Sequence, residues 1–205
     1  MKKTALTIAA VFASLNIFAQ GTVTFSNLGL NAPVITTVPL TVGTSVIPAG
    51  GAAPAGTTFM VALYWAPYPN PDPGPGTMPP PDSAFTQVGL SAPLLAPGIY
   101  ANGSRQAPIQ PPGYLGWFEV KAWSAAFGMT YEAAYQAGLA GQNALVGTTT
   151  ALKVDTGDPT TTPAGTPATL KGISGISLMP VVPEPAIIGL GLLGGVAMLL
   201  LRRRK

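Results

Sequence analysis

Short apolar runs alternate with proline and glycine along most of the chain, and this punctuation is typical of a β protein. Thr58–Trp65 is apolar at both alternating sets of positions, which predicts a central strand with two buried faces. Thr22–Asn27 alternates threonine and serine with Val23 and Phe25, which predicts an outer strand. The remaining strands are expected at Val34–Val42 (an edge strand, because Pro39 interrupts it), Ala84–Leu90, Ala144–Val154 and Leu170–Leu178.

Tyr114–Ser124 is the second strong strand candidate. Its two faces differ in polarity. Phe118, Val120 and Ala122 form an apolar face that belongs in the core. The opposite face mixes aromatic and charged residues and is expected to be exposed: Trp117, Glu119, Lys121 and Trp123.

One helix and two long loops complete the prediction. Thr130–Leu139 is expected to be helical, because Thr130 is a good N-cap, Glu132 favours the helix N-terminus, and Gly138 or Gly141 can end the helix. Ala66–Asp82 holds eight prolines in seventeen residues, which excludes a helix or a sheet ladder and predicts a stiff exposed loop. Ile47–Gly56 and Asp155–Pro167 are also expected to be loops, and Pro111-Pro112-Gly113 a turn.

The C-terminus has a different composition. Pro183-Glu184-Pro185 precedes sixteen uncharged, mostly apolar residues, Ala186–Leu201, and the chain ends in a basic group. A helix of that length spans roughly 24 Å, somewhat less than the hydrocarbon core of a bilayer. Snorkelling arginines and local thinning of the bilayer make up the difference. The basic residues are expected to stop transfer and to stay in the cytoplasm: Arg202, Arg203, Arg204 and Lys205.

The C-terminus has a Pro-Glu-Pro triplet, an apolar run and a basic end, in that order. It resembles the PEP-CTERM sorting signal of Gram-negative bacteria in all three parts. The resemblance covers residues 182–205 and implies processing by an exosortase, a membrane cysteine peptidase. A plain C-terminal membrane anchor is the alternative, although an anchor does not need Pro183, Glu184 and Pro185. Segments of the exported part are also similar to short exported PEP-CTERM proteins of Verrucomicrobia and related phyla: GTVTFSN, KAW, TYEAA and GQNAL.

The N-terminus carries a second targeting signal. Lys2 and Lys3 precede an apolar stretch, and Ile17-Phe18-Ala19 forms a cleavage site before Gln20. We therefore expect a signal peptide at residues 1–19, with an uncleaved anchor as the alternative. The mature exported domain then spans residues 20–181, a length that suits one domain.

Composition narrows the function of that exported part. It holds four basic and six acidic residues, a net charge of −2, which does not favour a nucleic-acid partner. The chain has no cysteine and no histidine. Disulfides, thiol catalysis, Ser-His-Asp catalysis and histidine-ligated zinc are therefore excluded.

Four groups of residues were weighed as sites. Trp65, Trp117 or Trp123 could stack on a sugar ring, although the favoured interpretation is that Trp117 and Trp123 cover the core rim or a neighbouring loop. Glu119 and Glu132 have the chemistry of a glycosidase pair, but solvated surface charges are favoured.

The other two groups are weaker. Asp155 and Asp158 supply half of a calcium loop, with a turn favoured. Asn102-Gly103-Ser104 matches a glycosylation acceptor, with a turn again favoured.

The sequence as a whole predicts a single antiparallel β-sandwich, Ig-like or jelly-roll-like, with one short helix between two targeting signals. The expected function is non-catalytic and needs neither a cofactor nor a metal. The protein is expected to pass through an inner-membrane intermediate, with its domain in the periplasm, and then to reach the outer surface or the extracellular matrix. The expected partners are exosortase, the inner membrane and, through the resemblance, exopolysaccharide and biofilm. A secreted carbohydrate-binding module is the alternative function.

Overall fold

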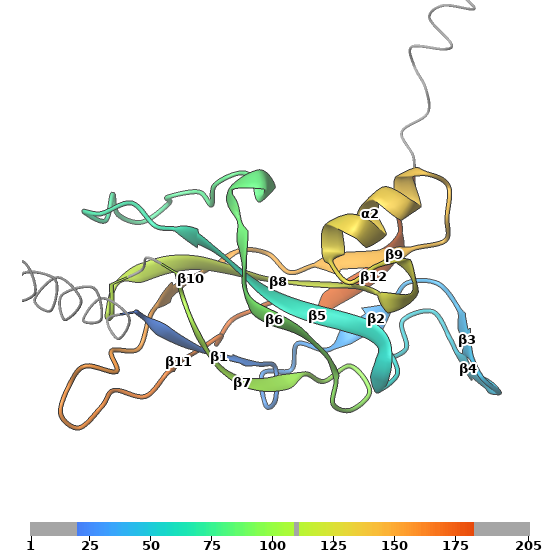
Figure 1. Ribbon diagram of the computed structural model, residues 1–205, viewed down its shortest axis with the longest axis horizontal. Helices are drawn as coiled ribbons and strands as arrows, with labels where there is room; N and C mark the ends of the chain where they lie inside the picture. Colours follow the sequence, from blue (N-terminus) through green and yellow to red (C-terminus); the bar gives the residue numbers. More distant parts are fainter. Residues whose placement is uncertain (1–19, 109–110, 183–205) are drawn as a thin grey trace, which may run out of the picture.

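The computed structural model describes residues 20–108 and 111–182 (Figure 1). The predicted signal peptide and the tail from Pro183 onward lie outside the described residues. The described part is mainly β, with curled sheets and one α-helix, α2 (Tyr131–Leu139). Two short 3-10 turns are η1 (Asp82–Ala84) and η2 (Ala125–Phe127). The strands are β1 (Thr22–Ser26), β2 (Val34–Thr36), β3 (Leu40–Val42), β4 (Ser45–Ile47), β5 (Gly56–Pro67), β6 (Thr86–Leu94), β7 (Ala101–Gln106), β8 (Leu115–Ser124), β9 (Leu145–Thr148), β10 (Leu152–Asp155), β11 (Ala168–Thr169) and β12 (Ile176–Pro180).

The strands form three sheets. The largest runs β2-β12-β9-β8-β5-β6, with β10 also paired to β8. A second sheet runs β11-β1-β7, and β3 and β4 form a separate hairpin. Most pairings are antiparallel, but β1–β11 and β2–β12 are parallel, so the prediction of a purely antiparallel arrangement was wrong. These parallel pairs join segments far apart in sequence, which hydrophobic alternation within one segment cannot reveal.

β5 and β8 are buried on both faces, and each face belongs to a different core. On one face, Val61 and Leu63 of β5 and Val120 of β8 pack against Val23 and Phe25 of β1. This core fills the space between the largest sheet and the sheet of β1, β7 and β11 (Figure 1). The face assignments predicted for the apolar residues of both strands are therefore confirmed.

The second core lies under an outer layer made by α2 and the proline-rich segment between β5 and β6 (Figure 1). Tyr68, Phe85 and Tyr131 from this layer pack on Trp117 and Trp123 of β8. The prediction that this face of β8 is exposed was therefore wrong, because the layer covers it. All four of its aromatic and charged residues are buried: Trp117, Glu119, Lys121 and Trp123.

Several other predictions are confirmed. α2 begins after Thr130, whose side chain accepts a hydrogen bond from Ala133 N–H, and the chain leaves the helix at Gly141 with a positive φ. β5 and β6 form the predicted hairpin around the proline-rich loop. The predicted edge position is confirmed for β2, but Val34–Val42 is two strands rather than one, because Pro39 lies between β2 and β3, which belong to different sheets.

Other predicted bounds need correction. Ala144–Val154 is two strands, β9 and β10, rather than one. The last predicted strand, Leu170–Leu178, is a strand only from Ile176 onward, in β12, and its first six residues connect β11 to β12. Asn102-Gly103-Ser104 is not an isolated turn but part of β7, where Gly103 has a φ of +72° beside an irregular register with β1. β7 has too few apolar residues for the alternation to predict it, and β4 is only three residues long.

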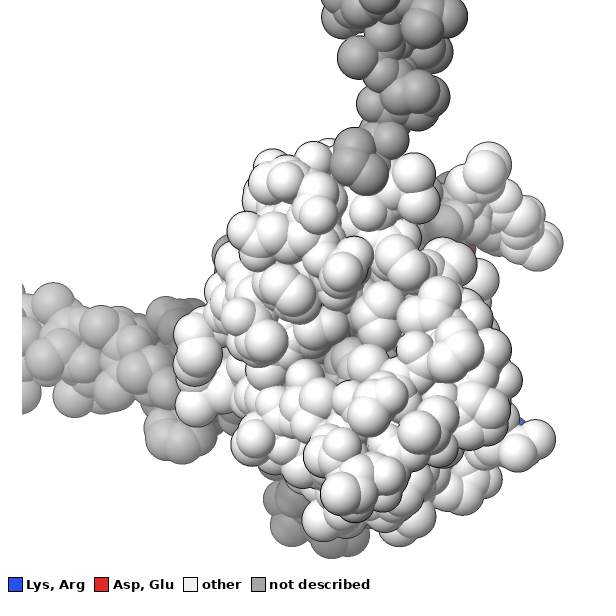
Figure 2. Space-filling model, turned by 90° about the vertical axis from the view of Figure 1, so that its right-hand side faces the viewer, with Lys and Arg blue, Asp and Glu red and all other residues white. Residues whose placement is uncertain are grey.

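The charged residues are unevenly placed. None occurs from Gln20 to Pro71, from Ala133 to Leu152 or from Gly172 to Val182. These stretches supply the β3–β4 hairpin, β9, β12 and most of α2, which gather at one end of the domain (Figure 1). Figure 2 looks onto this end, and almost no Lys, Arg, Asp or Glu is visible on it. We call it the uncharged end.

No helix within residues 20–108 and 111–182 is long and apolar enough to cross a bilayer. The predicted transmembrane helix, residues 186–201, lies outside these ranges.

We expect Leu63→Ala to lower the free energy of unfolding of the exported domain by about 3 kcal/mol, because Leu63 is fully buried between the two sheets. Leu90→Ala is the matched control, since Leu90 on β6 is 82% exposed and its truncation should cost less than about 1 kcal/mol. Chemical denaturation measures both. Equal losses for the two variants would contradict the described packing.

Candidate functional site

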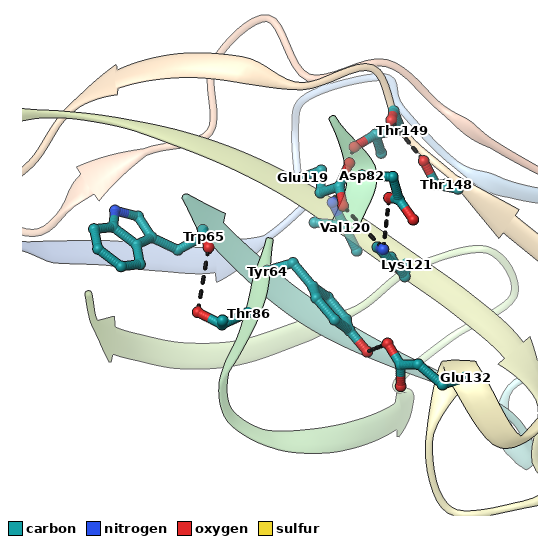
Figure 3. Close-up of polar contacts among 10 residues, drawn as sticks. All are labelled: Tyr64, Trp65, Asp82, Thr86, Glu119, Val120, Lys121, Glu132, Thr148 and Thr149. Carbon is teal, nitrogen blue, oxygen red and sulfur yellow. Dashed lines mark hydrogen bonds and ion pairs between the residues drawn. The ribbon is translucent and has the colours of Figure 1, made fainter. Parts of the chain in front are cut away.

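The Lys121 ammonium is the centre of the most concentrated charged cluster in the described residues. Lys121 lies on β8 under the outer layer and is 2% exposed. Its Nζ donates a hydrogen bond of 2.7 Å to Asp82 of η1 and lies 3.2 Å from Glu119 Oε1 (Figure 3). A buried ammonium needs such partners, because burial without them costs several kcal/mol.

Aromatic rings complete the surroundings of Lys121. Its Nζ lies 4.6 Å from the centre of the Tyr64 ring and 4.9 Å from that of Tyr131. The Tyr64 hydroxyl donates a hydrogen bond of 3.0 Å to Glu132 at the start of α2 (Figure 3). Burial, together with this carboxylate, raises the pKa of Tyr64. The cluster therefore fastens β5 and β8 to η1 and α2.

Glu119 is the most perturbed carboxylate of the cluster. Burial raises its pKa to about 7; Lys121 opposes the rise and Asp82 adds to it. Its Oε1 has the ion pair with Lys121 but accepts no hydrogen bond within the described part of the chain. The expectation that Glu119 is a solvated surface charge was therefore wrong, since it is 5% exposed. Glu132 is exposed, as expected.

A hollow of about 340 Å³ lies beside the cluster, lined by Asp82, Lys121, Tyr131, Glu132, Tyr135 and Gln136. Glu119 does not line it, so Glu119 and Glu132 do not face a shared cleft as a glycosidase pair must. Lys121 is held by carboxylates and aromatic faces. The chemistry of this cluster is that of a structural ion-pair network.

All three tryptophans are buried. Trp123 is fully buried and donates a hydrogen bond to the Gly128 carbonyl, and Trp117 packs on Tyr68. Trp65 faces the core between the two sheets. None presents an open ring face on which a sugar could stack. The favoured interpretation, that Trp117 and Trp123 cover a core, is confirmed.

The two carboxylates of the Asp155–Pro167 loop do not form a metal site. Asp158 accepts hydrogen bonds from the backbone N–H and the hydroxyl of Thr160, which makes a local turn as expected. In the described part of the chain, no three Asp or Glu side chains gather as metal ligands.

A second ion pair fastens the proline-rich loop. Asp72 accepts a hydrogen bond of 2.6 Å from the Tyr68 hydroxyl and lies 3.5 Å from Lys153 Nζ on β10. The hydrogen bond from the Tyr68 hydroxyl and, to a smaller extent, that from Gly74 N–H lower the pKa of Asp72. The loop is therefore anchored at its start by Asp72 and at its end by Asp82.

The predicted targeting signals adjoin the sheets directly. Gln20 is the first described residue, and Gly21 and Thr22 already form backbone hydrogen bonds with Ala107 and Gly157. Ala19 of the predicted cleavage site lies outside the described residues, as do Pro183, Glu184, Pro185 and the basic group Arg202–Lys205.

Val181 is the last residue with described tertiary contacts before the tail. Its N–H donates a hydrogen bond to the Ala144 carbonyl, and its side chain packs on Gly138 of α2. A Cβ at position 138 would collide with Val181, so glycine there permits the close approach. The predicted sorting motif therefore begins two residues after a fixed point of the fold.

Comparison of the chain with protein-family models, with curated proteins and with solved structures finds no match.

Sequence reasoning missed the Lys121 cluster, although a signal was present. Glu119 and Lys121 share one strand face with Trp117 and Trp123, and two tryptophans on that face indicate that something covers it. The partners Asp82 and Tyr64 come from segments remote in sequence, so no spacing could have indicated them.

We expect the stability of the domain to fall as the pH rises from about 4.5 to about 7. The pKa of Glu119 is higher in the folded state, so the folded state binds more protons in this range. The loss is at most roughly 3 kcal/mol for a shift of this size and levels off above the folded pKa.

Denaturation at several pH values checks this expectation with the wild type and Glu119→Gln. The glutamine variant should lack the fall, and the chain has no histidine that would titrate in the same range. An unchanged slope in Glu119→Gln would contradict the assignment to Glu119.

Proposed function

We propose that this chain is an exported, non-catalytic protein, sorted through a PEP-CTERM/exosortase system to the cell surface or the extracellular polysaccharide matrix. The observation that carries the proposal is the C-terminal order of three parts: Pro183-Glu184-Pro185, an apolar run of sixteen residues and a basic end. The signal peptide of residues 1–19 provides the export that such sorting requires.

The arrangement of the described domain supports this proposal. Its first strand, β1, and its last, β12, are both held in the sheets by pairing with other strands, β1 with β7 and β12 with β9. Removal of residues 1–19 and of the tail would leave every described strand and hydrogen-bonded pair intact. A processed protein would therefore keep its fold.

We propose that the exported part is a β-sandwich with an Ig-like or jelly-roll-like character. The support is the core shared by the largest sheet and the β11-β1-β7 sheet, to which Phe25 and Leu63 contribute from opposite sides. The parallel pairs make it a mixed sandwich rather than a purely antiparallel one.

A non-catalytic role is supported by the state of the charged groups. Lys121 is paired with Glu119 and Asp82 where the outer layer meets β8, and Lys153 and Asp72 anchor a loop. Each of these groups has a structural use. The carbohydrate-binding alternative loses its proposed platform, because Trp65, Trp117 and Trp123 are all buried.

A fusion of alkaline phosphatase to Lys205 tests the membrane topology. The signal peptide exports the domain and the basic end stays in the cytoplasm, where alkaline phosphatase is inactive. We therefore expect an inactive fusion from the full-length chain. A fusion at Val182 that lacks the tail is the positive control and should be active; activity in both fusions would contradict the topology.

Substitution of Pro183, Glu184 and Pro185 by alanine tests the sorting signal. The apolar run and Arg202–Lys205 remain, so the variant should still insert in the membrane. In a host with an exosortase, the wild type should lose its tail and the variant should accumulate uncut in the inner membrane, as the wild type should without exosortase.

Alanine at Pro79, Pro80 and Pro81 is the composition control, since these prolines lie in the loop before η1 and should not affect processing. Trimming of the Pro183–Pro185 variant at the wild-type rate would show that the tail is only an anchor.

A further inference from the structure

The β3–β4 hairpin is the most exposed part of the uncharged end. It pairs with no other strand and extends from the body of the domain (Figure 1). None of its residues is fully buried, and Val46 near its tip is 70% exposed. A lone two-stranded hairpin is marginally stable in water and gains from a surface to pack on.

A hollow of about 410 Å³ lies between this hairpin and the rest of the uncharged end. Its lining is largely apolar and includes Leu40, Phe59, Phe127, Leu145 and Pro180. Three further apolar side chains next to these elements are strongly exposed: Met129 at 81%, Met179 at 53% and Val182 at 77%. Exposed apolar side chains that gather without charges mark a surface for another apolar phase or partner.

The tail leaves the domain at this same end. Pro180 lines the hollow, and Val182 follows two residues later. Only residues 183–185 separate Val182 from the apolar run that begins at Ala186. Three residues span at most about 11 Å, even when fully extended. With the apolar run in a bilayer, Val182 therefore lies within about 11 Å of the hydrocarbon, in the headgroup layer or in the water next to it.

We propose that the uncharged end is a membrane-docking surface, which rests on the outer leaflet of the inner membrane while the tail is inserted. This inference rests on the proposed function, because the tail must first insert. The β3–β4 hairpin and Met179 enter the interfacial layer, and the charged clusters at Lys121 and Lys153 stay outside the membrane.

Charge placement favours lipid as the occupant over a protein partner. A surface without Lys or Arg gains nothing from anionic lipids, but a surface without charges avoids the large cost of removing charged groups from water when it approaches the hydrocarbon. The short connection to the inserted tail also gives the uncharged end a high effective concentration at the membrane, so weak apolar contacts are enough to dock it there. Neither argument requires a second copy or another protein.

The absence of cysteine allows single labels to test the surface. The full-length protein is reconstituted in vesicles of phosphatidylethanolamine and phosphatidylglycerol with a fluorophore at Val46→Cys, Thr161→Cys or Val196→Cys. Thr161 lies in the loop between β10 and β11, far from the hairpin (Figure 1), and Val196 reports on tail insertion. We expect lipid-borne nitroxide quenchers to quench the labels at 46 and 196 several-fold more than the label at 161.

A charged residue placed in the β3–β4 hairpin provides a second test of the docking surface. With the label at Thr44→Cys, Val46→Glu should abolish the quenching by lipid, while the matched exposed change Thr161→Glu should leave it unchanged. Val46 is largely exposed, so its replacement leaves the core intact.

The outcomes separate the two proposals. Quenching at 196 but not at 46 would overturn the docking surface and leave the anchor standing. No quenching at 196 would contradict the anchor and, with it, the docking proposal. Quenching at 46 that disappears when the protein is diluted in lipid would identify a second copy as the occupant and would also overturn the proposal.

Discussion

Burial of both faces of β5 and β8 is the constraint on which the rest of the structure depends. No disulfide can cross-link this chain, so packing must hold the domain together. One face of these strands packs on β1, and the other requires a cover, which α2 and the proline-rich segment provide. Lys121 lies under that cover, and its ion pairs with Asp82 and Glu119 fix where the cover sits. Removal of Lys121 would leave the buried Glu119 carboxyl without its ion-pair partner.

Strong local patterns were readable from the sequence, and remote pairings were not. The two-sided apolar pattern of Thr58–Trp65 correctly predicted β5, and the Thr130 cap correctly predicted α2. The charges at Glu119 and Lys121 predicted an exposed face on β8, because local alternation cannot show that another segment covers a strand. The parallel pairing of β2 with β12 joins residues about 140 positions apart, beyond the reach of any local pattern.

The same division applies to the sites. The predicted targeting signals are linear, so a prediction of their residues needs only the sequence: Pro183, Glu184 and Pro185, with the basic end. The Lys121 cluster and the uncharged end are assembled from several segments and needed the fold. The Lys121 cluster and the uncharged end also show how the charges are distributed over the domain. The charges gather where they stabilise the outer layer, and the end from which the tail leaves is free of them (Figure 2).

The intact mass of the protein released from exosortase-positive cells tests the central claim most directly. The account predicts a single chain that begins at Gln20 and ends before the apolar run of residues 186–201. Such a chain still contains β1, β12 and Val181 and should remain folded. A released protein that retains Arg202–Lys205 would contradict the account, because an intact tail cannot be a processed sorting signal.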